Sequence, residues 1–175
     1  MSDLVVIVYP TLEKAEEVRT RLFELQREYI IKLADAVIAT KSVNGQVQLH
    51  QVVNTTASGA VRGTFWGLLI GVLFLNPLLG AAMGAAGGAL GGALTDFGIN
   101  DQFMKQLAES IHPGESALFV LIKEMTADKV IEQIKHYGGV VLQTSLDDAK
   151  EQALRHALAG HVESDAAVPA AGTAS

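Results

Sequence analysis

Short apolar runs and amphipathic stretches alternate in the first part of the chain. The run Leu4–Tyr9 is ended by Pro10, and this pattern predicts a buried strand. After Thr11, apolar residues recur every three or four positions and form one face of a predicted helix, for which Thr11 is the expected N-cap. The residues of that face are Ala15, Val18, Leu22, Leu25 and Tyr29.

Two more strands are predicted over residues 34–43 and 46–53. The pair Asn44-Gly45 between them favours a two-residue type I′ hairpin turn, in which both residues adopt positive φ. Apolar and polar residues alternate in the second strand, so one of its faces should be buried and the other solvated. This region therefore predicts a β-hairpin after the first helix.

The chain after residue 100 returns to the same kind of pattern. A short helix is predicted over residues 101–111, a turn at 112–114 and a buried strand over 116–122. A further helix is expected to stop at Gly138-Gly139, and a last strand follows over 140–144.

A terminal helix is predicted after the last strand. Ser145 is followed three residues later by Asp148, which resembles a capping box with Asp in place of the usual Glu. The pattern therefore predicts that the helix starts at Ser145. Residues 161–175 offer little to bury and are predicted to form a disordered tail.

The predicted elements fit one discontinuous α+β domain. Without residues 55–99, their order is β-α-β-β-α-β followed by α-β-α. The first six elements are those of a ferredoxin-like sandwich, which the additional α-β-α extends. We therefore predict one domain from residues 1–54 and 100–160, with an inserted segment over 55–99.

The inserted segment differs sharply from the rest of the 175-residue chain. It contains two charged residues but eleven of the 17 glycines. It is also rich in large apolar residues, and a flexible linker would instead combine glycine with polar residues. Its aromatic residues Phe65, Trp66 and Phe74 are candidates for contact with lipid.

Eight of these glycines recur at four-residue intervals in two series. This spacing places them on one helical face, where the absence of side chains lets another helix approach closely. In water each interior glycine destabilises a helix by about 0.5–1 kcal/mol relative to alanine. A bilayer or a packed oligomer core is therefore expected to support these helices. The predicted helix-packing residues are Gly59, Gly63, Gly67, Gly71, Gly80, Gly84, Gly88 and Gly92.

Asn76 and Pro77 separate the two glycine series and predict a turn. The arms on either side, residues 58–75 and 78–95, would each be about 27 Å long as helices. This length is close to the roughly 30 Å thickness of the hydrocarbon core of a bilayer. The segment therefore predicts a glycine-zipper helical hairpin that leaves the domain and returns on the same side.

Two environments are open for this hairpin. A membrane-embedded hairpin fits the length of the arms. A hairpin buried inside a large soluble assembly fits the short apolar run 64–75 and the charge of Arg62 within the first arm.

Several stretches of the sequence resemble one bacterial family. They are the opening LVVIVYP, the glycine-spaced hairpin, the exit FGIND and the strand PGESALFVLI. Together they are similar to the domain-of-unknown-function family twelve sixty-nine, and the resemblance covers residues 3–158. It implies a membrane- or envelope-associated, ferredoxin-like protein with a glycine-zipper hairpin. The family supplies no catalytic residues.

The sequence contains no recognisable catalytic or metal-binding pattern. The chain has no cysteine, and its five histidines lack the spacing typical of metal ligands. Neither a nucleophile elbow nor a phosphate-binding glycine motif occurs, and Asp147-Asp148 is placed to cap a helix. The formal net charge of −6 argues against general nucleic-acid binding. We therefore expect no enzymatic activity, no cofactor, no metal and no nucleic-acid partner.

The leading hypothesis is a non-enzymatic membrane protein that self-assembles through its hairpins, in a structural or envelope- and stress-related role. Its partners would be other copies of itself and the lipid bilayer. The chain starts without an export signal, which places the domain in the cytoplasm and the hairpin in the bacterial inner membrane. The alternative is a soluble homo-oligomeric shell or filament in the cytoplasm, with the hairpins and bound lipid in its interior. A third hypothesis is a regulatory domain that binds a small ligand between sheet and helices.

Overall fold

The computed structural model of the chain describes residues 2–50, 66, 106 and 109–166. Strands in this part of the chain form one five-stranded sheet from β1 (Asp3–Tyr9), β2 (Ile31–Lys41), β3 (Val47–His50), β4 (Ser116–Met125) and β5 (Val140–Thr144). The helices that lie entirely within it are α1 (Leu12–Arg27), α6 (Ala127–Ile134) and α7 (Asp148–Ala166), with a 3₁₀ turn (Lys135–Tyr137) after α6. The predicted α+β class is confirmed.

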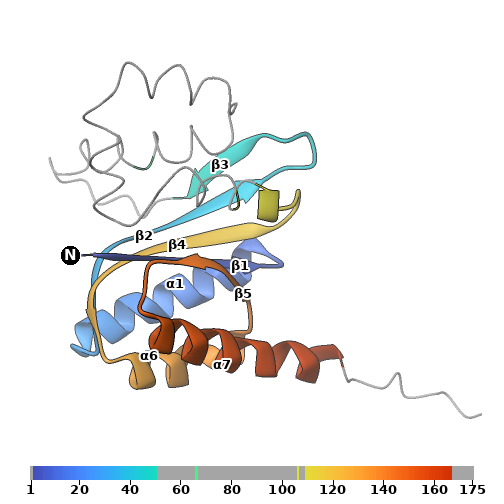
Figure 1. Ribbon diagram of the computed structural model, residues 1–175. Coiled ribbons are helices and arrows are strands. Elements are labelled where there is room, and N and C mark those ends of the chain that lie inside the picture. Colours follow the sequence, from blue (N-terminus) through green and yellow to red (C-terminus); the bar gives the residue numbers. More distant parts are fainter. Residues whose placement is uncertain (1, 51–65, 67–105, 107–108, 167–175) are drawn as a thin grey trace, which may run out of the picture.

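The described sheet has the order β3-β2-β4-β1-β5, in which β4, from after the insertion, lies between β2 and β1, from before it (Figure 1). Each neighbouring pair is antiparallel. Helix α1 joins β1 to β2, and β4 lies between those two strands. Helix α6 joins β4 to β5, and β1 lies between them. The two β-α-β units are therefore interlocked, and the strands on both sides of the insertion share one sheet.

The sequence interpretation took residues 101–111 as the second helix of the predicted six-element unit, and of these the structure describes residues 106 and 109–111. It treated α6 and β5 as an extension of the unit. In the structure α6 follows β4, and β5 pairs directly with the central part of β1. β3 pairs with β2 at an edge of the described sheet and does not pair with β1.

The strand boundaries also differ where polar residues interrupt an apolar run. β2 begins three residues before the predicted 34–43, and β4 ends three residues after the predicted 116–122. Lys32 and Glu124 pair across these two extensions, and Lys32 Nζ lies 3.4 Å from Glu124 Oε1. Because cross-strand ion pairs support a sheet, polar residues at this end remain in the strands.

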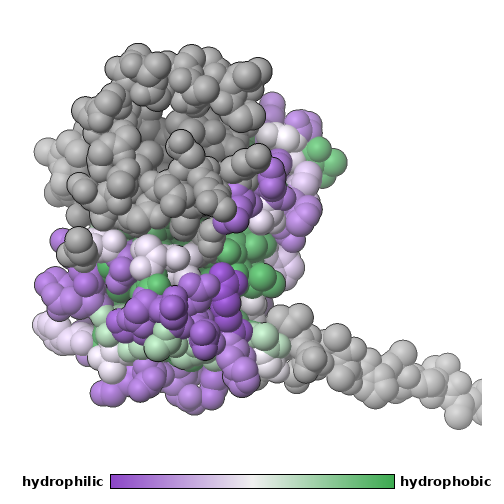
Figure 2. Space-filling model, viewed as in Figure 1, coloured by the Kyte–Doolittle hydropathy of each residue, from purple (hydrophilic) through white to green (hydrophobic). Residues whose placement is uncertain are grey.

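Side chains from both faces of the sheet are buried. In β1, Val5, Ile7 and Tyr9 belong to the core that packs against α1, α6 and α7, which all lie on one side of the sheet (Figure 1). The alternating residues Leu4 and Val6 belong to a separate core on the opposite face. This double burial explains why β1 is a continuous apolar run rather than an alternating one. Hydrophilic side chains cover much of the outer surface of the helix layer (Figure 2).

Helix α1 begins as predicted and ends earlier than its pattern suggests. The side chain of Thr11 accepts a hydrogen bond from Lys14 N at 3.2 Å, so Thr11 is the N-cap. The last helical residue is Arg27, and Tyr29 lies beyond it with φ 59° and 96% of its surface exposed. Backbone bonds from Tyr29 N to Gln26 O and from Ile30 N to Leu25 O form a Schellman motif. The prediction that Tyr29 belongs to the buried face was therefore wrong.

Tyr29→Gly is expected to raise the free energy of unfolding by about 1 kcal/mol. The αL conformation of Tyr29 suits glycine, and its fully exposed ring contributes little burial that could be lost. Urea denaturation followed by circular dichroism measures the change. Tyr29→Ala is the control, because alanine keeps the backbone strain and should not stabilise. Equal stability of the two variants would contradict a strained backbone at this position.

The β2–β3 hairpin has a different turn from the predicted type I′. Gly45 has φ 82°, but Asn44 is not among the described residues with positive φ. Gly45 N donates to Ser42 O at 2.9 Å, and Ser42 N donates to Gln46 O at 2.8 Å. These bonds indicate a type I turn followed by a glycine bulge, which is a common three-residue hairpin loop.

The start of α7 is capped by Asp147 rather than by Ser145. Asp147 Oδ1 accepts from Lys150 N at 3.0 Å, and the hydrogen bond from the Lys150 side chain lowers the pKa of Asp147. Ser145 Oγ instead accepts from Leu4 N at 2.8 Å, and Ser145 N donates to Leu4 O at 2.9 Å. These bonds extend the contact between β5 and β1. Helix α7 continues to Ala166, whereas the sequence predicted that a disordered tail starts at residue 161.

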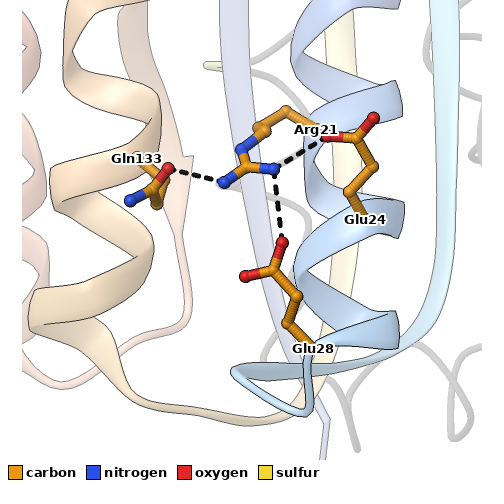
Figure 3. Close-up of polar contacts among 4 residues, drawn as sticks. All are labelled: Arg21, Glu24, Glu28 and Gln133. Atoms are coloured by element: carbon orange, nitrogen blue, oxygen red, sulfur yellow. Dashed lines mark hydrogen bonds and ion pairs between the residues drawn. The ribbon is translucent and has the colours of Figure 1, made fainter.

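Helices α1 and α6 are joined by one arginine (Figure 3). Arg21 Nη2 donates to Gln133 Oε1 on α6 at 2.6 Å, and Arg21 Nη1 donates to Glu24 Oε2 at 2.8 Å. Glu28 Oε1 lies 3.4 Å from the same nitrogen. The hydrogen bond to Glu24 is the main cause of the raised pKa of Arg21. This cluster fixes the relative position of two helices that cover the sheet.

Candidate functional site

The described strands on either side of the inserted segment pair with the same part of β2. His50, the last described residue of β3, pairs with Ile38. Ser116, the first residue of β4, pairs with Thr40 on the other side of β2. The last described residue of β3 and the first residue of β4 therefore face residues of β2 that are two positions apart.

Hydrogen bonds hold His50, the last described residue of β3. Arg19 Nη1 on α1 donates to His50 O at 2.6 Å, and His50 Nε2 lies 3.1 Å from Thr40 Oγ1. Burial of the Arg19 guanidinium lowers its pKa, and nearby Glu16 opposes this shift. Because the Arg19 guanidinium is charged, its hydrogen bond to His50 O is stronger than a hydrogen bond between two neutral groups.

The segment just before β4 is held by Lys41, the last residue of β2. Lys41 Nζ donates to Ile111 O at 3.4 Å, and Lys41 O accepts from Gly114 N at 2.7 Å. The turn between them is closed by Glu115, whose side chain accepts from His112 N at 2.9 Å. Gly114 has φ 90°, and Glu115 N donates to His112 O, so the turn predicted at 112–114 is confirmed.

The sheet face opposite the helices is apolar, and we call it the insertion face. Its buried strand residues come from β1, β2 and β4, and two residues from outside the strands, Trp66 and Ile111, belong to the same core. The strand residues that define the insertion face are Leu4, Val6, Val8, Val37, Ala39, Ala117, Phe119 and Leu121. This face is where a described residue of the inserted segment contacts the domain.

Trp66 is that residue, and its indole is docked on the insertion face. Its exposed fraction is 1%, and its Nε1 donates a hydrogen bond to Asp35 Oδ2 at 2.8 Å. The ring meets that of Phe119 edge to face, with centroids 5.9 Å apart and planes inclined by 71°. Aromatic pairs favour this geometry, and buried indole N–H groups need an acceptor. The three side chains therefore form one contact with both an apolar and a polar component.

A β-bulge places Asp35 on this otherwise apolar face. Leu33 pairs with Ile122 and Asp35 pairs with Leu121, so β2 contains one extra residue between them. Asp35 therefore shares the insertion face with Leu121. Its Oδ1 accepts from Ala36 N at 2.8 Å, which leaves Oδ2 for the indole. The backbone bond holds the carboxylate in place to receive Trp66.

Asp35 was not predicted as a site residue. Its one sequence signal is a single acid within the apolar run LADAVIA. Trp66 was predicted as a candidate for lipid contact, but its side chain lies against protein in this structure. The remaining predicted site residues lie outside the described part of the chain: Phe65, Phe74, Asn76, Pro77 and the eight glycines Gly59, Gly63, Gly67, Gly71, Gly80, Gly84, Gly88 and Gly92.

The helix-side core contains a small apolar cavity and one buried polar atom. The cavity measures about 30 Å³ and is lined only by apolar side chains from the sheet and the three helices. Apolar cavities known to hold benzene are about 150 Å³, so this space is too small for a ligand of that size. In the same core, Tyr9 Oη has no hydrogen-bond partner among the described residues, and burial raises the pKa of Tyr9.

Within the described residues, no helix combines the length and apolar character that crossing a bilayer requires. The same residues hold no group of three or more side chains arranged to bind a metal ion.

Comparison with known proteins identifies the family. One family model, described as a protein of unknown function, DUF1269, matches residues 60–159. The chain belongs to the DUF1269 family. This confirms the resemblance to family twelve sixty-nine. The DUF1269 match includes Trp66 and Phe119, whereas Asp35 lies outside its range. No curated protein and no solved structure matches the chain.

Proposed function

We propose that this DUF1269 protein is a non-enzymatic, self-associating protein whose inserted segment 55–99 forms a glycine-zipper helical hairpin in a membrane. The α+β domain would hold the hairpin from the cytoplasmic side. The observation that carries the proposal is that the described strand residues on either side of the insertion, His50 and Ser116, pair with Ile38 and Thr40, which lie two residues apart on β2. A hairpin that enters and leaves a bilayer on one side requires such an attachment.

The glycine spacing supports self-association as the role of the hairpin. Two series of four glycines give each chain helical faces on which close packing is favourable. Together they would destabilise isolated helices in water by about 4–8 kcal/mol relative to alanine, so the helices need a packed or membrane environment. The partners are therefore further copies of this chain and lipid.

We also infer that the domain is ferredoxin-like, with a composition that differs from the predicted one. Its six elements would be β1-α1-β2 and β4-α6-β5, and the interlocked strand order supports this inference. β3 and α7 would then be additions to the unit. Such a fold accommodates many functions, so it supports a domain that carries the hairpin without indicating an activity.

The variant Gly84→Leu together with Gly88→Leu is expected to reduce the oligomer to a smaller species. Two leucines on the predicted packing face would prevent close approach of helix backbones. Size-exclusion chromatography and native mass spectrometry of the detergent-extracted full-length chain measure the change. The matched control is Gly160→Leu, a glycine in α7 with open space around its Cβ position. A membrane-bound double variant with an unchanged oligomer size would contradict the packing role.

The buried position of Trp66 favours a second candidate, a soluble homo-oligomer with hairpins and bound lipid in its interior. In this assembly the first arm would stay against the sheet, as Trp66 does. Alkaline carbonate extraction distinguishes the two candidates. Retention in the membrane pellet until detergent is added supports the membrane protein, and release as a large soluble particle supports the soluble assembly.

A further inference from the structure

The docked position of Trp66 conflicts with a first arm that crosses a bilayer. Trp66 is the ninth residue of the arm 58–75, so in a straight helix it lies about 12–14 Å from either end. In a bilayer-crossing arm it would therefore lie near the middle of the hydrocarbon layer. Its partner Asp35, however, belongs to β2 of the domain and bonds to Trp66 at 2.8 Å. One molecule cannot satisfy both positions at the same time.

We propose that the contact of Trp66 with Asp35 and Phe119 is an autoinhibitory docking contact, which holds Trp66 on the insertion face and must open before the first arm enters a membrane. This inference rests on the proposed membrane function. The structure thus represents the docked state, with the indole 1% exposed on the insertion face. Membrane entry exchanges this protein environment for lipid.

Asp35 shifts the equilibrium between the docked and the membrane-inserted state because its hydrogen bond with Trp66 forms in the docked state alone. In the docked state its Oδ2 accepts the indole N–H. After release this oxygen has no Trp66 partner, while Oδ1 keeps the bond from Ala36 N within the same strand. Replacing the carboxylate by a methyl group therefore weakens the docked state selectively. The apolar part of the contact, provided by Phe119, stays in place.

The test uses the fluorescence of Trp66, which is the single tryptophan of the chain. Full-length protein is mixed with vesicles of phosphatidylethanolamine and phosphatidylglycerol, with and without brominated acyl chains. Without vesicles, we expect blue-shifted emission that acrylamide quenches poorly. In the vesicle-bound fraction, we expect the bromines to quench the emission strongly, because the indole has moved from the sheet into the acyl chains.

Variants of Asp35 test its part in the docking contact. Asp35→Ala should lower the lipid concentration needed for half-maximal binding by about tenfold, as expected for loss of a hydrogen bond to a charged group. Asp35→Asn offers one acceptor oxygen to two N–H donors, those of Ala36 and Trp66, so its lipid binding should lie between that of the wild type and that of Asp35→Ala. Asp128→Ala is the charge-matched control, since Asp128 is an exposed residue of α6. It shows how much binding to anionic lipid changes when one negative charge is removed.

Each outcome bears on the proposal. Bromine quenching of bound wild type, together with stronger binding of Asp35→Ala than of Asp128→Ala, supports it. Binding without quenching, or equal binding of these two variants, overturns the docking contact and leaves the membrane function standing. If neither wild type nor variants bind vesicles, the membrane function fails and the inference fails with it. The quenching measurement needs no variant, so it holds even if Asp35→Ala does not fold.

Discussion

Replacing Gly139 by alanine is expected to lower the free energy of unfolding by about 2–5 kcal/mol. Gly139 has φ 99°, and a Cβ at this position would lie 2.6 Å from Tyr9 Cε1 and 2.9 Å from Ile7 Cγ2. Both neighbours are fully or almost fully buried, so neither can move aside without disturbing the core. The backbone strain costs about 1–2 kcal/mol and overpacking about 1–3 kcal/mol. Urea denaturation of the purified full-length chain measures the sum.

Gly45→Ala separates the two causes. Gly45 has a similar φ of 82°, but no atom lies within 4 Å of its Cβ position. This variant should therefore lose only the strain contribution, about 1–2 kcal/mol. A loss at Gly139 no larger than the loss at Gly45 would contradict the tight contact between Gly139 and the Tyr9 ring.

Gly139 also illustrates what could be predicted from the sequence. The pair Gly138-Gly139 was predicted to stop a helix, and Gly138 does end the 3₁₀ turn after α6 with φ 67°. Such signals depend on backbone preferences within a few residues, as does the Thr11 N-cap. The contact of Gly139 with Tyr9 depends on how β5 lies against β1, so no local pattern contains it.

The errors arose where a tertiary contact competes with a local signal. Ser145 and Asp148 look like a capping box, but Ser145 bonds to Leu4, 141 residues earlier in the chain. Asp147 is then left to cap α7. Tyr29 is a different case: it follows the apolar spacing of α1, but the local Schellman motif ends the helix before it. Local sequence patterns indicate which residues can cap or end a helix, and contacts between distant segments determine which of these residues does so.

The candidate site was harder to predict from the sequence than the fold class. The predicted element order implied an α+β domain, but it did not show that β5 pairs with β1 or that β3 lies at an edge. The Asp35–Trp66 bond joins residues 31 positions apart, and the bulge that places Asp35 is visible only in the β2–β4 register. The glycine spacing identified the inserted segment, and the position of Trp66 then connected it to the sheet.

Phe119→Ala is expected to lower the free energy of unfolding by about 3–5 kcal/mol and to shift Trp66 emission to longer wavelength. Phe119 is fully buried in β4, a strand in the interior of the sheet, and its ring meets the indole edge to face. The substitution removes a large core side chain and leaves a cavity beside Trp66. Denaturant titration followed by circular dichroism gives the stability, and the emission of the folded variant reports the surroundings of the indole.

Leu118→Ala is the matched control, because adjacent residues of a strand point to opposite faces. Leu118 is also fully buried, but it belongs to the helix-side core. It should lose about 2–5 kcal/mol of stability while Trp66 emission stays unchanged. A comparable emission shift in both variants would mean that the indole responds to general loosening and not to its contact with Phe119. A shift confined to Phe119→Ala would place Trp66 on the insertion face in solution, because of these two neighbours only Phe119 lies on that face.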